Sequence, residues 1–527
     1  MVLFGPPAAA ALSPQVVAPA PFGVFHDLRW LLVYHSSWFG FAVALWLILV
    51  LRTTLDVVLT RAAWPQAIEV PRWREHLRAS VTFTAVQAVV LLPFAALTFS
   101  MAVTSLSWLF YVAVPVLVMI GLLVHHGTVE RTWLRDAPNR ASVTSLLWAF
   151  AILTGGGAVI AVSPSWARPA IAAVVGVGIA WSRARMVHAL AGRVVTRTRR
   201  QPFALVGIAA VVVLVVVGTA LGFAVAVAVE SGRTQLPEVR SDASGPPVLV
   251  VKGFNSEWDG VTRRWVDGRH RIARFSYAGL DEQGRPRPYD RGATHGSIRS
   301  LVHAMRRQVA ELRRATGAPV SIVAESEGAL IAQAYMAGTP NAPVRALVLL
   351  SPLVEPGRVH YPRLGHEGWG VVTGTVTDGI AGALGWIGPV DVSSDTPLFR
   401  SIVNEEPALS RLLRCPPPAV RSFVVLPLDS GVSAPAPVEI GFRHAVVPAF
   451  HGGLLGDRTT QDLIRAVLRG RSSHGSGFWS FSADVVNAGA AAWQAPSLVL
   501  SLEPSWDARL DDAPCRAVRD EIRTWLD

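Results

Sequence analysis

The fold is decided by residues 320–330, which read VSIVAESEGAL. Val320–Ala324 has the length and composition of a buried strand, and a helix-forming run follows Ser326 directly. A serine at such a junction lies on a strained turn, which accepts only small residues two places before it and two places after it. Ala324 and Gly328 meet this requirement. The stretch therefore predicts a strand–turn–helix unit that presents a serine hydroxyl above a sheet edge.

Strand and helix patterns alternate on both sides of this unit. We expect further strands at Val248–Val251, Arg271–Tyr277, Val344–Leu350, Ser422–Leu428 and His444–Val447, and helices at Ile298–Ala315, Gly328–Met336 and Asp462–Leu468. Such alternation is typical of a mostly parallel sheet covered by helices on both faces.

Residues 248–470 resemble an α/β-hydrolase of the esterase/lipase type. That family orders its catalytic residues as serine, acid and histidine. The resemblance implies Ser326 as nucleophile, Asp429 just beyond a strand as the acid, and His451 after the last strand as the base. Competing positions are Asp391, Asp395 and His444. The alternatives are an ordinary turn serine, a turn carboxylate and a structural loop histidine.

The resemblance also implies an oxyanion hole. Its donors are the backbone N–H groups of Glu327, after the nucleophile, and Phe254, after the first strand. The sequence departs from the family at Ala324, which replaces the first elbow glycine, and at Glu325, where many relatives carry histidine. The loop Lys252–Asn255 also departs, since it stands where His-Gly is common. We expect Glu325 and Glu327 to be structural or rim carboxylates, and Lys252 to be a solvated charge, with an oxyanion-loop or headgroup contact as the alternative.

The implied chemistry is acyl transfer through a covalent acyl-enzyme. Residues 361–413 lie where the family inserts a cap, and their apolar composition favours a lipophilic carboxylic ester as substrate. The same three residues also fit an acyltransferase acting on envelope lipids or glycans, or a peptidase. A further alternative is a transport or assembly protein with a non-catalytic hydrolase-like module. No conspicuous intramembrane ion pair is expected, which disfavours this alternative.

The first half of the chain is of another kind. Of 527 residues 51% are hydrophobic and only 16% are charged, and no charged residue occurs from Ser80 to Val124 or from Pro202 to Val229. Spans need about 20 apolar residues. We expect an all-α bundle of about six transmembrane helices at Leu31–Leu51, Val81–Val103, Leu106–Val124, Val143–Val162, Pro169–Trp181 and Phe203–Val227. The fifth is short because Arg168 and Arg183 enclose it.

Arginine explains much of the net charge of +11. It concentrates in three loops, at residues 52–78, 131–140 and 183–200, and arginine-rich loops stay cytoplasmic. Six spans place all three loops on that side, and they place both termini and the second half outside the cell membrane. The clustering beside apolar spans favours a lipid bilayer as partner and excludes nucleic acid.

The expected organisation is a multi-pass domain at 1–229, a linker at 230–247 and the hydrolase-like domain at 248–527. The two cysteines, Cys415 and Cys515, both fall in the outer half, where a disulfide is permitted. Two free buried thiols are the alternative. His125 and His126 flank a span and are expected to be interfacial. No metal-ligand spacing or phosphate-binding loop is found, so no cofactor is expected.

Overall fold

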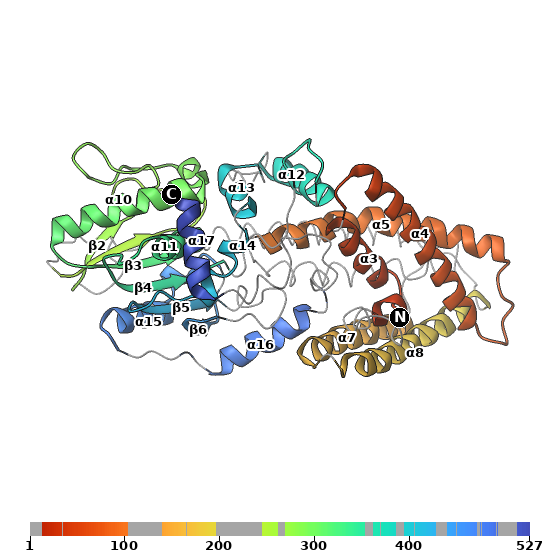
Figure 1. Cartoon of the computed structure of the whole chain (residues 1–527). Coiled ribbons are helices and arrows are strands. Elements are labelled where there is room, and N and C mark those ends of the chain that lie inside the picture. The colour runs from red at the N-terminus through yellow and green to blue at the C-terminus, as the bar shows by residue number, and fades with distance from the viewer. Residues whose placement is uncertain are drawn as a thin grey trace.

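The computed structural model describes residues 13–33, 35–103, 140–164, 166–195, 245–261, 269–353, 362–368, 370–385, 395–404, 406–427, 440–449, 451–471, 475, 477–491, 493 and 514–527. A helical bundle built from the first half of the chain lies beside a part that contains a sheet (Figure 1).

Six parallel strands form one sheet in the order β2-β1-β3-β4-β5-β6. They are β1 (Pro247–Val251), β2 (Arg271–Arg274), β3 (Val320–Glu325), β4 (Val344–Leu350), β5 (Arg421–Pro427) and β6 (Arg443–Val447). The prediction of a mostly parallel sheet is confirmed, and only β2 is shorter than expected. Strand β2 lies on one side of β1 and strand β3 on the other, so the strand order reverses at β1. In parallel sheets, ligands bind preferentially at the carboxyl ends of the strands beside such a reversal.

Helices cover both faces of this sheet, because successive strand side chains point to opposite sides. One face packs with Met305 of α10 (Ile298–Thr316), Tyr335 of α11 (Glu327–Gly338) and Ile522 of α17 (Cys515–Leu526). The other face packs with Ile464 of α15 (Arg458–Leu468). This part of the chain also contains shorter helices: η2 (Arg291–His295), α13 (Pro397–Asn404), α14 (Glu406–Leu409), η3 (Leu412–Arg414) and η4 (Leu454–Gly456).

The bundle contains α2 (Ser13–Val16), α3 (Phe22–Val33), α4 (Trp38–Ala62), α5 (Trp73–Val103), α7 (Arg140–Val162) and α8 (Arg168–Val195). Within the described residues three segments are long and apolar enough to cross a membrane: Trp38–Ala62, Trp73–Ala96 and Arg168–Ala191. Thr144–Ile160 of α7 is a shorter apolar helix. The chain therefore has the character of a membrane protein, with three candidate spans where six were expected. Two expected spans, 106–124 and 203–227, lie outside the described residues, as does most of the linker.

Two expected boundaries in the bundle are wrong. The first expected span, 31–51, is divided, because Ser37 caps the start of α4 by accepting a hydrogen bond from the Gly40 N–H. The segment before this cap is the separate helix α3, whose side chains are almost all buried. The fifth span continues past Arg183, which we expected to mark its end.

Arg183 can lie inside α8 because its charge is paired. Its guanidinium donates to the Asp56 carboxylate and, at 3.2 Å, to the Thr60 hydroxyl of α4. A second pair joins Arg52 of α4 to Asp27 of α3, with N–O distances of 2.7 and 2.9 Å. Both pairs are largely buried, and the Asp56–Arg183 pair joins two candidate spans, so the bundle contains buried ion pairs that the sequence did not indicate.

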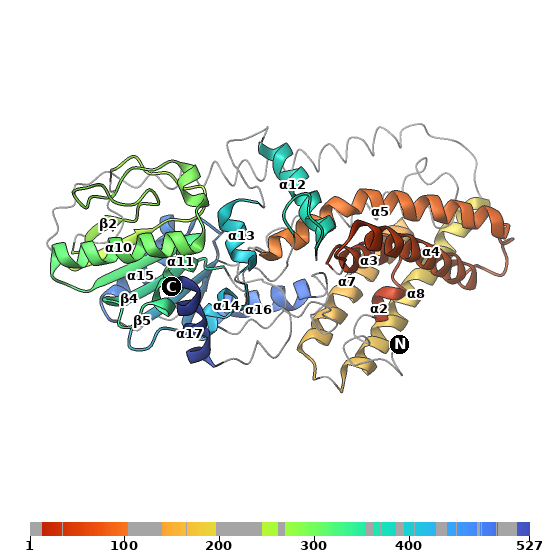
Figure 2. The ribbon, with the colours of Figure 1, turned by 45° about the horizontal axis from the view of Figure 1, so that its top comes forward.

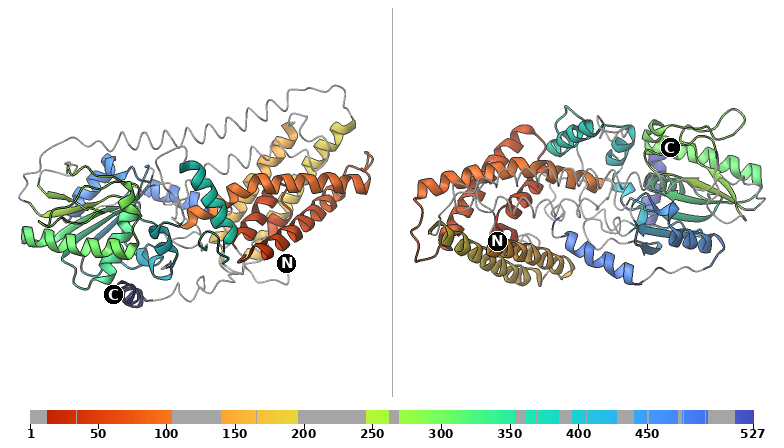
Figure 3. Two further views of the ribbon diagram at one scale, coloured as in Figure 1. Left: turned by 90° about the horizontal axis from the view of Figure 1, so that it is seen from above. Right: turned by 180° about the vertical axis from the view of Figure 1, so that it is seen from behind.

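Two elements of the second half of the chain pack against the bundle. Helix α12 (Val371–Gly385), within the expected cap, lies beside α5 (Figure 2), and its Thr373 hydroxyl donates to the Leu32 carbonyl of α3. Helix α16 (Gly477–Ala491) lies between β6 and α7. Seen from above and from behind, these helices bridge the sheet and the bundle (Figure 3).

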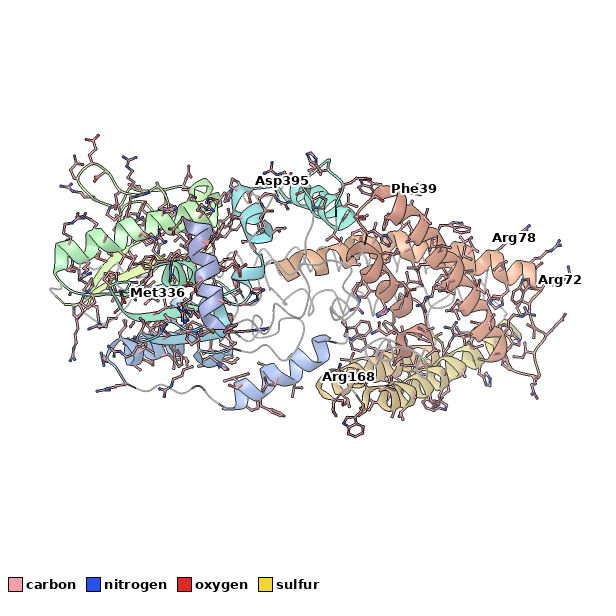
Figure 4. The ribbon with its side chains drawn as sticks, in the orientation of Figure 1. Phe39, Arg72, Arg78, Arg168, Met336 and Asp395 are labelled. Atoms are coloured by element: carbon pink, nitrogen blue, oxygen red, sulfur yellow. A yellow bond between two sulfur atoms is a disulfide. The ribbon has the colours of Figure 1, made fainter. Side chains whose placement is uncertain are left out.

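Arginines lie at both ends of the bundle. Arg72 and Arg78, around the start of α5, lie at the end away from the sheet, whereas Arg168 at the start of α8 lies at the end nearer the sheet (Figure 4). The connection between α4 and α5, one of the three arginine-rich loops, is therefore remote from the sheet.

Candidate active site

The turn after β3 holds Ser326 in a strained conformation. Its φ is 55° and its ψ is −120°, and positive φ values are uncommon for residues other than glycine. Backbone strain of this kind costs about 1–3 kcal/mol and persists where surrounding structure enforces it. Here β3 on one side and α11 on the other fix the turn, and the Ser326 N–H donates to the Leu350 carbonyl of β4 at 2.9 Å.

Close packing explains the small residues around this turn. A Cβ atom at Gly328 would lie 2.6 Å from the Lys252 carbonyl oxygen, and one at Gly253 would lie 2.8 Å from the Ser326 Cβ. Both distances are shorter than packed atoms allow. The loop after β1 therefore lies directly against the serine, as an oxyanion-forming loop would have to.

His451 follows β6 and lies against Ser326. The Ser326 hydroxyl and the Nε2 atom of His451 are 2.7 Å apart, a hydrogen-bond distance. Burial lowers the pKa of His451 to about 4, so the imidazole is neutral near pH 7. A neutral imidazole at this distance is able to accept the hydroxyl proton.

Of the three candidate acids, only Asp395 lies within the described residues. Asp429 and Asp391 lie outside the described residues; β5 ends at Pro427, two positions before Asp429. Asp395 lies 3.5 Å from the guanidinium of Arg400 and accepts a hydrogen bond from the Leu364 N–H, so it holds the cap region together. His444, the competing histidine, is exposed on β6 and is not part of the site.

The expected oxyanion donors flank the serine from two sides. Glu327 is the first residue of α11, and the first N–H groups of a helix lack partners within the helix. Phe254 belongs to the loop that packs on Ser326. Its ring stacks on His295 at 4.8 Å between centroids and meets the Phe399 ring of α13 at 5.7 Å. Helices η2 and α13 thus fix the Phe254 side chain, and α13 lies within the expected cap.

Two buried carboxyl groups flank Ser326 in sequence. Burial raises the pKa of Glu325, although the Lys252 ammonium, 3.9 Å away, opposes the rise. Burial alone raises the pKa of Glu327 well above its usual range. We expected both carboxylates to be structural or at the rim of the site; both are buried, and Lys252 lies beside Glu325. This burial was not foreseen because it depends on loops distant in sequence.

A disulfide joins Cys415, after η3, to Cys515, the first residue of α17. It holds α17 beside α11, the helix that begins after Ser326. A Cβ atom at Gly338 of α11 would lie 2.3 Å from Leu526 Cδ1, so the two helices are closely packed. The bridge therefore ties the residues after η3 to a helix that packs on α11, which begins directly after Ser326.

Among the described residues no group of three His, Cys, Asp or Glu side chains has the geometry of a metal site. His125 and His126 lie outside those residues. Comparisons of the chain with protein-family models, with curated proteins and with solved structures found no match.

Proposed function

We propose that the chain is a membrane-anchored serine hydrolase with an α/β-hydrolase fold that cleaves carboxylic esters. The observation that carries the proposal is the 2.7 Å contact between the strained Ser326 hydroxyl and His451. A serine in an ordinary turn does not need a strained backbone, a neutral buried imidazole beside its hydroxyl and a tightly packed neighbouring loop. Strain of this kind collects at functional sites.

In this mechanism His451 takes the Ser326 proton as the hydroxyl oxygen attacks the ester carbonyl carbon. The carbonyl oxygen becomes an oxyanion, which the backbone N–H groups of Glu327 and Phe254 stabilise. Collapse of this intermediate breaks the ester bond, and His451 returns the proton to the leaving alcohol. Water then repeats the sequence on the acyl-enzyme and releases the acid. Asp429 orients the imidazole and stabilises its cationic form.

A lipophilic substrate is supported by the position of the cap. Helix α12 packs on α5 and α3 of the bundle, and α13 reaches the Phe254 ring. The expected cap thus contacts the bundle through α12 and the loop beside Ser326 through α13. Placement outside the cytoplasm is supported by the distance of the α4–α5 connection from the sheet (Figure 4).

The test is labelling of intact cells with a membrane-impermeant fluorophosphonate probe. The wild-type chain should label, and Ser326→Ala should not. Ser321→Ala is the matched control, because Ser321 is a buried serine five residues earlier on β3. Equal labelling of wild type and Ser326→Ala would overturn the proposal. Labelling only after the cells are opened would retain the hydrolase and reverse its orientation.

A transport or assembly function is a second candidate, favoured by the buried Asp27–Arg52 and Asp56–Arg183 pairs. Ionisable groups inside membrane bundles often mark pathways for ions or polar solutes. A folded wild-type protein that resists the probe would favour this candidate over the hydrolase.

A further inference from the structure

We propose that α16 enters the bilayer obliquely, so that the part of the chain that carries the serine is seated in the membrane interface by this helix. The inference needs only the membrane character of the bundle and stands whether or not Ser326 is catalytic. The partner is the lipid of the membrane that the bundle crosses.

The first observation is an apolar face on α16 that no described protein element covers. Phe478 and Phe481 are each 66% exposed and Val485 is 55% exposed. Their spacing of three and four residues places them on one side of the helix. Ala483 and Trp479 point the other way, toward the packed interior. A soluble helix with this arrangement would expose its hydrophobic side to water.

The second observation is where α16 leads. Trp493, just beyond its end, is 5% exposed and lies inside the bundle. Its ring stacks on Phe150 of α7 at 5.2 Å and meets Phe22 of α3 at 5.6 Å. Its indole N–H donates to the Thr154 hydroxyl at 2.8 Å. Helix α7 ends at Val162, about 12 Å from Thr154 at 1.5 Å per residue. Trp493 therefore contacts α7 well inside the bundle and not at the end of that helix.

The third observation is that other exposed aromatic side chains lie at the end of the bundle nearer the sheet. Helix α16 packs along α7. The connection from α7 to α8 bears Trp166, which is 82% exposed, and α4 begins with the exposed Trp38 and Phe39. Aromatic side chains collect where membrane spans meet water. The exposed phenylalanines of α16 add to these aromatic side chains, because α16 runs between α7 and β6.

The other end of α16 is fixed to the sheet. A Cβ atom at Gly475, just before the helix, would lie 2.7 Å from the Ala445 Cβ of β6. Strand β6 leads directly to His451. Lipid contact along α16 therefore holds the edge of the sheet next to the candidate site close to the bilayer.

Spin labels on single introduced cysteines test this in the full chain reconstituted in phospholipid vesicles. The native cysteines are joined to each other, so Phe478→Cys, Phe481→Cys and Val485→Cys provide the only free thiols. Val177→Cys, exposed within a candidate span, is the lipid control, and Ala315→Cys, exposed on α10, is the water control. Mass mapping checks that the native disulfide is intact in each variant.

The expected result is that labels at 481 and 485 collide with oxygen and resist a water-soluble nickel chelate, as at 177. Depth should increase from 478 to 485. Accessibility at all three positions equal to that at 315 would overturn the proposal. All three side chains are mostly exposed, and the one ring contact that is lost is that of Phe478 with Trp479, so the variants should fold.

Discussion

The Nε2 atom of His451 lies 2.7 Å from the Ser326 hydroxyl in a setting that keeps the imidazole neutral. The imidazole belongs to a loop after the last strand, and the hydroxyl belongs to a turn 125 residues earlier. The sheet brings them together, because both follow the carboxyl ends of parallel strands. The first two predictions depend on this contact.

The rate of Ser326 modification should depend on pH with a midpoint near 4 rather than near 6.5. Burial lowers the pKa of His451 to about 4, and only the neutral imidazole accepts the serine proton. The labelling rate should therefore be flat above about pH 5 and fall tenfold for each unit below about pH 4. Labelling reactions that are stopped at set times, at pH values across this range, measure how the labelling rate depends on pH. A midpoint near 6.5 would show that burial does not set the pKa of His451 in the active form, because the imidazole is solvated or because a carboxylate such as Asp429 offsets the burial.

Gly253→Ala should slow fluorophosphonate labelling by about 10²-fold, the order of loss that a displacement near 1 Å produces at a reacting group. The new Cβ would lie 2.8 Å from the Ser326 Cβ, so the turn or the loop must shift. Gly382→Ala is the control, because nothing lies within 4 Å of its added Cβ. Comparable rates for Gly253→Ala and wild type would mean that the loop moves without disturbing the nucleophile.

Reduction of the Cys415–Cys515 disulfide should destabilise the part of the chain around the sheet. The bridge closes a separation of 100 residues, for which the chain-entropy model gives about 4–5 kcal/mol. We expect reductant to lower the unfolding temperature of the wild type, measured by thermal denaturation in detergent. The double variant Cys415→Ser/Cys515→Ser should already be lowered and should not respond to reductant. A reductant response in that variant would trace the effect to another cause.

Arg183→Ala should destabilise the bundle by about 3–5 kcal/mol, since it leaves the buried Asp56 carboxylate without its charge partner. Asp56→Leu/Arg183→Leu, which removes both charges, should be more stable than the single variant. Denaturation in mild detergent compares them. A single variant as stable as wild type would show that water reaches Asp56.

Most of the sheet could be predicted from the sequence, because strand patterns are local. Val344–Leu350 matches β4 at both ends, and VSIVAESEG placed Ser326 between a strand and a helix. His451 could be placed beside Ser326 only through a resemblance, since nothing local joins two residues so far apart. The third member, Asp429, stays a prediction.

The bundle was harder to predict because hydrophobicity says little about partners. Arg183 looks like the end of a span until Asp56 is known to face it. Nothing in the composition of residues 31–51 shows that Ser37 would divide them and leave α3 buried. The contacts of α12 and Trp493 with the bundle depend on pairings across 300 residues or more, which no local pattern contains.

The packing of α17 on α11 has a consequence for how the protein is made. During synthesis Gly338 is added to the chain long before Leu526. Helix α11, which begins after Ser326, therefore emerges from the ribosome without α17 beside it. Until Cys515 has been produced and oxidised, the apolar side of α11 is open to chaperones and proteases. A chain that stalls before that point would carry Ser326 on a helix that still lacks α17 as its neighbour.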